Sequence, residues 1–197
     1  MLDTTFNAPK IEATDYTPLP DDMYQVELLD IESKMSESFD SKKARATNPA
    51  LAPVMEPILS FTFTVLDDSI IVNGKAENVR GRNIWMNFVH AYLYIGKSGK
   101  NDLYKIVEAL QGSSLTQEQE AYGISGTALN ALIGKQCRVV TKQVTKNGKT
   151  YMDVDNLLPA KAPLSPLTAQ EKVDATPKSK DDAAEVAADA SSEAVTE

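Results

Sequence analysis

Hydrophobic and polar residues alternate in three stretches of the first ninety residues, and each stretch predicts a β-strand. The clearest covers 58–66, where large apolar residues alternate with serine and threonine. Another covers 23–31, and its alternation slips at Leu29, which indicates a bulge or burial on both faces. The third covers 82–90. Residues 32–57, between the first two strands, are polar and then rich in proline and alanine, which predicts a long loop.

The period changes after residue 100. Residues 101–112 carry apolar side chains at helical spacing, begin with an Asn-Asp pair that supplies an N-cap, and end at a glycine. A second, shorter helix is expected within 125–134, from a serine cap to a glycine stop. Two further strands, 136–144 and 150–158, flank an Asn-Gly pair, the strongest short signal for a tight hairpin.

The resulting order is three strands, a helical insertion and two strands. It predicts a mainly β fold, and specifically a five-stranded oligonucleotide-binding (OB) barrel with the helical insertion between strands three and four. A small sandwich and another kind of five-stranded barrel are the alternatives. We expect an extended N-terminal lead-in over 1–20, the OB domain over 21–160 and a disordered acidic C-terminal tail over 161–197.

The charge of the chain is segregated. The formal net charge is -8, yet residues 23–160 hold equal numbers of acidic and basic residues, and the two flanks carry the excess acid. Within the neutral body, residues 135–151 contain five basic residues and no acidic one. An acidic average therefore does not argue against a polyanionic partner.

The residue inventory argues against catalysis. There is one histidine, His90, and one cysteine, Cys137, which falls inside a predicted strand and is expected to be buried and inert. The sequence contains neither a phosphate-binding loop motif nor the spacing of zinc ligands. We therefore do not expect the protein to be an enzyme, and we expect it to bind neither a metal nor a cofactor. With no apolar run long enough for a membrane span and no signal-peptide layout, we expect a cytoplasmic protein.

Nucleic-acid binding is better supported. Proteins that bind single strands combine cations along the phosphate path with aromatic faces for unstacked bases. In an OB barrel, the groove lies between the loop after strand one and the hairpin between strands four and five, where this chain carries its basic clusters. The candidate DNA-binding residues are Lys34, Phe39, Lys42, Lys43, Arg45, Arg80, Arg82, Trp85, Tyr92, Tyr94, Lys97, Lys100, Lys142, Lys146, Lys149 and Tyr151.

Each candidate has a simpler interpretation. Lysines beside a hairpin turn are often solubilising charges on an edge strand. Trp85 and Phe88 fall on opposite faces of their strand, so one is expected in the core and the other free, and the pattern does not choose between them. Residues 181–197 hold six acidic residues and no basic one, which suits either a solubilising tail or a mobile mimic of a polyanion.

Several segments carry a family resemblance: "PILSFTFTVLDD", "RGRNIWMNF", "LYKIVEALQG", "LIGKQCRVVTKQV" and "NGKTYMDVDNLLPA". Together with "LPDDMYQVELLDIESK", they resemble bacteriophage-encoded single-stranded DNA-binding proteins of the OB type, over roughly residues 18–160. The acidic tail is similar to the tails of such proteins. The tail departs from them because it ends Ala-Val-Thr-Glu, without an aromatic or apolar residue at its tip. The domain departs from the family in its insertion over 33–57, which is longer than expected.

The resemblance implies sequence-independent binding of single-stranded DNA in phage DNA replication or recombination, in the cytoplasm of an infected bacterial cell. The acidic tail would regulate this binding and dock replication or recombination proteins. The alternative is a phage protein–protein interaction or inhibitor module, built on a small β-barrel, that does not bind nucleic acid. No membrane partner is expected, and a homodimer stays open.

Overall fold

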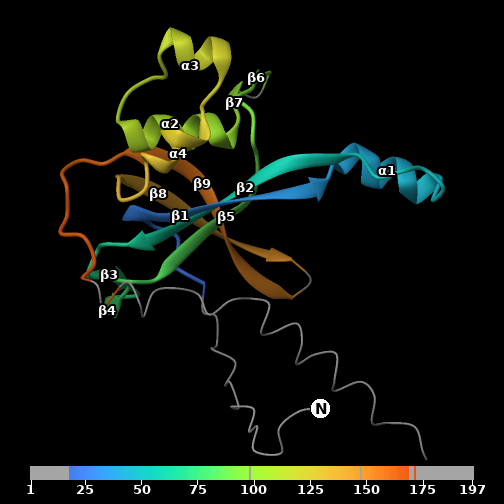
Figure 1. Ribbon diagram of the computed structural model, residues 1–197. Coiled ribbons are helices and arrows are strands. Elements are labelled where there is room, and N and C mark those ends of the chain that lie inside the picture. The colour runs from blue at the N-terminus through green and yellow to red at the C-terminus, as the bar shows by residue number, and fades with distance from the viewer. Residues whose placement is uncertain (1–17, 98, 147, 169–170, 172–197) are drawn as a thin grey trace, which may run out of the picture.

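The computed structural model describes residues 18–97, 99–146 and 148–168, together with Glu171 (Figure 1). The long strands are β1 (Met23–Glu37), β2 (Met55–Val65), β5 (Asn83–His90), β8 (Gln136–Lys146) and β9 (Lys149–Pro159). Two small ribbons are formed by β3 (Ser69–Val72) with β4 (Lys75–Asn78) and by β6 (Ile95–Gly96) with β7 (Gly99–Lys100). The helices are α1 (Phe39–Thr47), α2 (Asp102–Gln111), α3 (Gln117–Tyr122) and α4 (Gly126–Asn130).

The five long strands form one antiparallel sheet in the order β5-β2-β1-β8-β9. Three helices lie between β5 and β8, so the expected mainly β fold with a helical insertion after the third long strand is confirmed. Strands β5 and β9 are the edges of the sheet, and no ladder joins them within the described ranges. Helix α2 packs against both of these edge strands and against β8, and so spans the gap between them.

The core follows the predicted alternation. Phe61, Phe63 and Val65 on β2 are completely buried, and so is Val26, which pairs with Val65 across the ladder. Helix α2 presents its apolar face to this layer through residues that include Ile106, also completely buried. Burial of large apolar side chains at every second strand position is the main stabilising contribution to such a sheet.

The slip predicted in β1 is a bulge. The register with β2 shifts between Leu28 and Asp30, so Leu29 is the extra residue. At the same point the backbone of Leu28 exchanges hydrogen bonds with the turn before β8, donating to the Lys135 carbonyl at 3.0 Å and accepting from the Gly134 amide at 2.8 Å. Strand β8 pairs with β1 only up to Glu27, whose partner Gln136 is the first residue of β8, so β1 continues past this point with β2 alone.

The helical signals are confirmed with one difference in length. The Asn101 side chain caps α2 by accepting from the Tyr104 amide, and Gly112 ends the helix in the left-handed region at φ +71°. Helix α4 begins after a Ser125 cap as expected but ends at Asn130, and Gly134 lies in the turn that follows, at φ +83°.

The long loop predicted over 32–57 is wrong. Strand β1 continues to Glu37 and β2 begins at Met55, and these two residues pair at the end of an unbroken ladder. Helix α1 joins the strands, with Ser38 as its N-cap. We call residues 32–57 the arm; it extends from the body of the sheet to α1 (Figure 1). Both faces of its strands are largely solvated, so its sequence lacks the apolar alternation of a half-buried strand.

The N-terminal and C-terminal flanks are partly ordered. Residues 161–168 follow the sheet: Gln25 Nε2 donates to the Ala162 carbonyl at 2.6 Å, and Gln136 Nε2 donates to the Leu164 carbonyl at 2.8 Å. Leu167 is buried against Leu66. The predicted tail therefore has an ordered beginning, and the rest of it, apart from Glu171, lies outside the described residues, as do residues 1–17 of the predicted lead-in.

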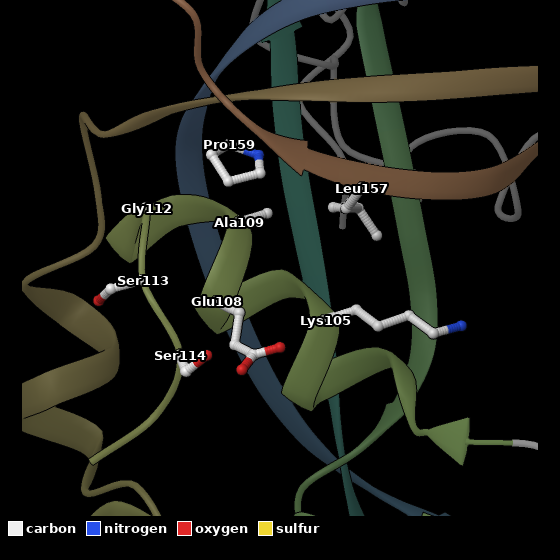
Figure 2. A pocket seen from close by; sticks show the side chains of 8 residues that line it. All are labelled: Lys105, Glu108, Ala109, Gly112, Ser113, Ser114, Leu157 and Pro159. Carbon is white, nitrogen blue, oxygen red and sulfur yellow. The ribbon is translucent and has the colours of Figure 1, made fainter.

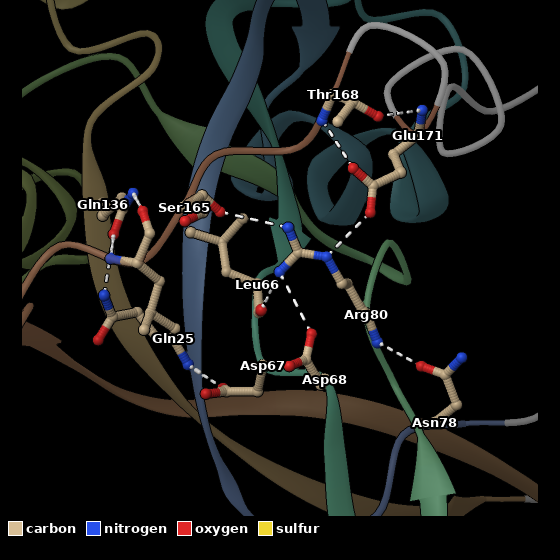
Figure 3. Close-up of polar contacts among 11 residues, drawn as sticks. Gln25, Leu66, Asp67, Asp68, Asn78, Arg80, Gln136, Ser165, Thr168 and Glu171 are labelled. Atoms are coloured by element: carbon tan, nitrogen blue, oxygen red, sulfur yellow. Dashed lines mark hydrogen bonds and ion pairs between the residues drawn. The ribbon is translucent and has the colours of Figure 1, made fainter.

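Arg80 holds this C-terminal segment to the sheet (Figure 3). Its guanidinium donates to the Leu66 carbonyl at 2.6 Å, to the Glu171 carboxylate at 2.9 Å and to the Ser165 carbonyl at 3.3 Å. Hydrogen bonds from Thr168 and Arg80 hold the pKa of Glu171 at about 2, below its ordinary value of 4.5. None of the helices in the described part of the chain is long and apolar enough to cross a membrane.

The low pKa of Glu171 predicts how stability depends on pH. A carboxylate whose pKa is lowered by folding stabilises the fold above the unfolded pKa, and this contribution is lost as pH falls through the folded pKa. E171Q is therefore expected to be less stable than wild type at pH 7, with a difference that shrinks below pH 4.5 and vanishes only below about pH 2. Denaturant unfolding across this pH range measures it, with the exposed carboxylate variant D155N as the control. Equal stability of E171Q and wild type at pH 7 would contradict the anchoring role of the Arg80–Glu171 contact.

Candidate nucleic-acid interface

The β8–β9 hairpin gathers one group of the predicted residues. The hairpin prediction is confirmed: Lys146 and Lys149 pair at its end, and Val144 pairs with Tyr151. Opposed residues in an antiparallel ladder share a face, as do alternate residues of one strand. Lys142, Lys146, Lys149 and Tyr151 therefore lie on one face of the hairpin, and all four are exposed. The acid Asp153 is opposite Lys142 on that face.

A second bulge turns an aromatic ring outward at the end of β5. The register with β2 jumps from Leu59–Val89 to Phe61–Met86, which leaves an extra residue on β5. Phe88 lies in this bulge at φ +63°, and its side chain is 65% exposed. The left-handed region costs a residue other than glycine about 1–2 kcal/mol. The fold thus holds a large apolar ring in solvent at an unfavourable backbone position, a combination that is often found at functional sites.

The expectation that either Trp85 or Phe88 is core is wrong. Phe88 is exposed and Trp85 is half-buried, while the buried positions of β5 are Ile84 and Val89. The bulge explains the difference, because one extra residue moves every later side chain to the opposite face. Trp85 pairs with Thr62, on the outer face of β2.

Lys34 lies over the ring of Phe88, and two further rings, those of His90 and Tyr92, follow it along the chain. Lys34 Nζ is 5.4 Å from the centroid of the Phe88 ring, within the range of a cation–π contact. The His90 and Tyr92 rings are 5.1 Å apart between centroids, and His90 Nδ1 is 3.6 Å from a Glu56 carboxylate oxygen. We call Lys34, Phe88, His90 and Tyr92 the aromatic cluster. It combines positive charge with exposed rings, the two features that a single-strand site requires.

The aromatic cluster is built on three neighbouring strands. Lys34 on β1 and His90 on β5 both pair with Ile58 on β2, so they lie on the same outer face of the sheet. This face is not uniformly positive, because Asp30 and Glu32 follow it along β1, opposite Thr62 and Ser60. The cations are concentrated at the β8–β9 hairpin and at the arm, on either side of an acidic stretch.

Four of the predicted cations are held by acidic partners. Their charged atoms lie 2.7–3.1 Å from a carboxylate oxygen. The pairs are Arg45–Glu37, Arg80–Glu171, Arg82–Glu77 and Lys100–Glu108. Lys100 also lies over the Tyr104 ring at 4.4 Å. These side chains serve intramolecular contacts, and the structure does not bring them into the aromatic cluster.

The remaining predicted residues lie around these groups. Phe39, Lys42 and Lys43 are exposed on α1, at the end of the arm. Tyr94 and Lys97 are exposed at the β6–β7 ribbon. Phe88 and His90 are not among the predicted site residues. A positive φ at a phenylalanine has no sequence signal, and so the bulge that exposes Phe88 could not be located in advance.

The described part of the chain gives little support for a reactive cysteine, a metal site or a small-molecule pocket. Burial raises the pKa of the Cys137 thiol to about 12, so its buried sulfur is not available as a thiolate. Within the described ranges, no three His, Cys, Asp or Glu side chains gather closely enough to hold a metal ion. A hollow of about 250 Å³ lies between the C-terminal half of α2 and the end of β9 (Figure 2). It is smaller than a typical small-molecule pocket, and its Glu108 is already bound to Lys100.

The strained backbone at Phe88 predicts a difference in stability between two variants that both lack the ring. F88A and F88G both remove the ring, but only glycine adopts a positive φ without a steric penalty. F88G is therefore expected to be more stable than F88A by about 1–2 kcal/mol. Thermal or denaturant unfolding of the two variants measures the difference. If F88A is as stable as F88G, residue 88 is not held in the left-handed region.

No protein-family model and no curated protein matches this chain.

Proposed function

We propose that the sheet is an OB fold and that the protein binds single-stranded DNA without sequence preference. Partly open five-stranded barrels of this kind carry a helix between the third and fourth strands. In support of the fold, the five long strands lie in the order β5-β2-β1-β8-β9, and α2 contacts the two edge strands across the gap between them. OB folds bind oligonucleotides across strands two and three and the two flanking loops, which correspond here to β2, β5, the arm and the β8–β9 hairpin.

The exposed Phe88 ring is the observation that carries the proposal. It is held outward at an unfavourable φ, beside Lys34 and near the His90–Tyr92 pair. An aromatic face in solvent next to an ammonium group fits an unstacked base with its phosphate. Such stacking contributes about 1–3 kcal/mol per base and tolerates any sequence, because every base has a π-face.

The hairpin supplies the charge for the phosphate backbone. Lys146 and Lys149 are directly opposed in the ladder, and like charges in this arrangement repel. In the described part of the chain neither forms an ion pair. An anion bound between them would offset the repulsion. Tyr151 lies on the same face and adds a second exposed ring, 48% accessible.

The wider role follows from the family resemblance of the sequence. We infer a non-enzymatic protein of phage DNA replication or recombination that acts without metal or cofactor in the cytoplasm of an infected bacterial cell. The acidic tail would compete with DNA and dock replication or recombination proteins. The second candidate is a protein–protein interaction or inhibitor module, which the acidic Asp30 and Glu32 on the outer face of β1 favour.

Binding to oligo(dT) distinguishes these functions. The protein is expected to bind oligo(dT) more tightly than duplex DNA of equal length, because only unstacked bases can reach the aromatic rings. The affinity should fall with salt, with a log–log slope of about -0.7 for each phosphate neutralised. Fluorescence anisotropy at several salt concentrations measures both. Equal binding of duplex, or no binding at low salt, would favour the interaction module.

Charge reversal tests the hairpin separately. The triple variant K142E/K146E/K149E is expected to weaken oligo(dT) binding by about tenfold or more and to reduce the salt slope by about 2, because three phosphate contacts are lost. Its melting temperature should stay close to that of wild type, since exposed charges contribute little to stability.

The matched control is K75E/K135E/K161E. It makes the same change in net charge at three exposed lysines outside the hairpin. Similar losses of affinity in the two triple variants would mean that net charge matters and that the hairpin has no particular role.

A further inference from the structure

We call α1 and residues 48–55, at the end of the arm, the arm tip. It exposes an unusually long apolar run. The seven consecutive residues 49–55, Pro-Ala-Leu-Ala-Pro-Val-Met, are all exposed. Val54 is 62% accessible, and Phe39, at the start of the adjoining α1, is 76% accessible. Contiguous apolar surface of this kind is unfavourable in water and is typical of a contact site for another macromolecule.

Hydrogen bonds hold the Val54 end of this run in place. The Ser41 hydroxyl accepts from the Val54 amide at 2.9 Å and donates to the Glu37 carboxylate at 2.7 Å. Arg45 donates to both oxygens of the same carboxylate, and the Val54 carbonyl accepts from the Ser38 amide. The Ser41 hydrogen bond and Arg45 lower the pKa of Glu37. The backbone at Val54 is therefore preorganised, which reduces the entropy lost when this end of the run is covered.

The chemistry of the tip suits a protein partner better than a nucleic acid. Unstacked bases bind to aromatic faces, whereas the run 49–55 consists of aliphatic residues, proline and methionine. Methionine and aromatic side chains are enriched in the cores of protein interfaces. Lys42 and Lys43 are exposed beside this surface and form no ion pair within the described ranges. A complementary partner would carry an exposed aromatic residue and acidic groups.

The same chain carries such a surface. We call residues 113–134, which contain α3 and α4, the helical cap. It holds two acidic residues, Glu118 and Glu120, and no basic residue. Neither carboxylate forms an ion pair in the described part of the chain; Glu120 accepts a hydrogen bond from the Tyr104 hydroxyl. Tyr122, at the end of α3, is 88% accessible, more than any other large hydrophobic residue that is described.

We propose that the arm tip of one copy docks on the helical cap of a second copy. A contact between two arm tips would bring lysines against lysines. A contact between an arm tip and a helical cap instead places Lys42 and Lys43 opposite two glutamates. The tip and the cap occupy different parts of the molecule (Figure 1), so one copy can use both at once. A contact between two different surfaces does not close on itself and extends as an open chain unless its rotation forms a ring.

This contact does not depend on nucleic acid. If the proposed function holds as well, a chain of copies would coat a single strand cooperatively, since each bound copy offers a docking site to the next. Association of the free protein and cooperativity on DNA can therefore be measured separately, and one can fail without the other.

The experiment uses sedimentation velocity of the full chain over a range of concentrations, without DNA. Wild type is expected to form dimers and longer species, and V54D and Y122S should each weaken the association at least about tenfold. Both residues are highly exposed, so the variants should keep the melting temperature of wild type. I71D is the matched control, because Ile71 is 71% accessible on β3 and lies in neither surface.

Mixing the two variants tests the head-to-tail arrangement. Y122S keeps an intact tip and V54D keeps an intact cap, so an equimolar mixture should form a single tip–cap contact. The expected product is a dimer that grows no further. Wild type that stays monomeric at all concentrations would overturn the proposal, and so would association that V54D or Y122S leaves unchanged. A mixture that forms no dimer would overturn the tip–cap pairing.

Discussion

The separation of the sheet at Leu28 is the constraint on which the rest of the structure depends. Strand β1 pairs with β8 only over its first five residues and with β2 as far as Glu37. The bulge at Leu29 and the two hydrogen bonds between Leu28 and the turn before β8 fix the point of separation. Beyond it, β1 and β2 continue as the arm, whereas β8 and β9 continue as the hairpin past the opposite end of the same ladder, where Met23 pairs with Val140. Both features of the proposed site are thus extensions of strands whose other ends lie in the core.

Rigid attachment explains how the surface can display unfavourable features. The Phe88 ring is exposed in a strained bulge, but the strand around it is anchored by Ile84 and Val89 in the core. The arm tip exposes apolar residues, but Ser41, itself bound to Glu37, holds the backbone at Val54. In both places buried or hydrogen-bonded neighbours supply the stability that the exposed group does not. This division is expected where a surface is kept for binding and not for folding.

Local patterns predicted most of the body. The alternation on β2, the Asn101 cap and Gly112 stop of α2, and the Asn147-Gly148 hairpin signal each depend on neighbours in the sequence. The arm was mistaken for a loop because strands solvated on both faces show no apolar alternation. Asn73-Gly74, which joins β3 to β4, carries the same hairpin signal, although no hairpin is predicted there.

The contacts of Arg80 and the exposure of Phe88 could not be predicted, because they depend on distant partners and on a bulge. The central claim is that the outer face of β2 and β5 contacts unstacked bases. Trp85 is the single tryptophan of the chain and lies on this face, so its fluorescence reports contact directly. Titration with oligo(dT) is expected to quench or shift the emission in step with binding measured by anisotropy of a labelled strand. Unchanged emission at full saturation of binding would contradict the claim and place the DNA on another surface.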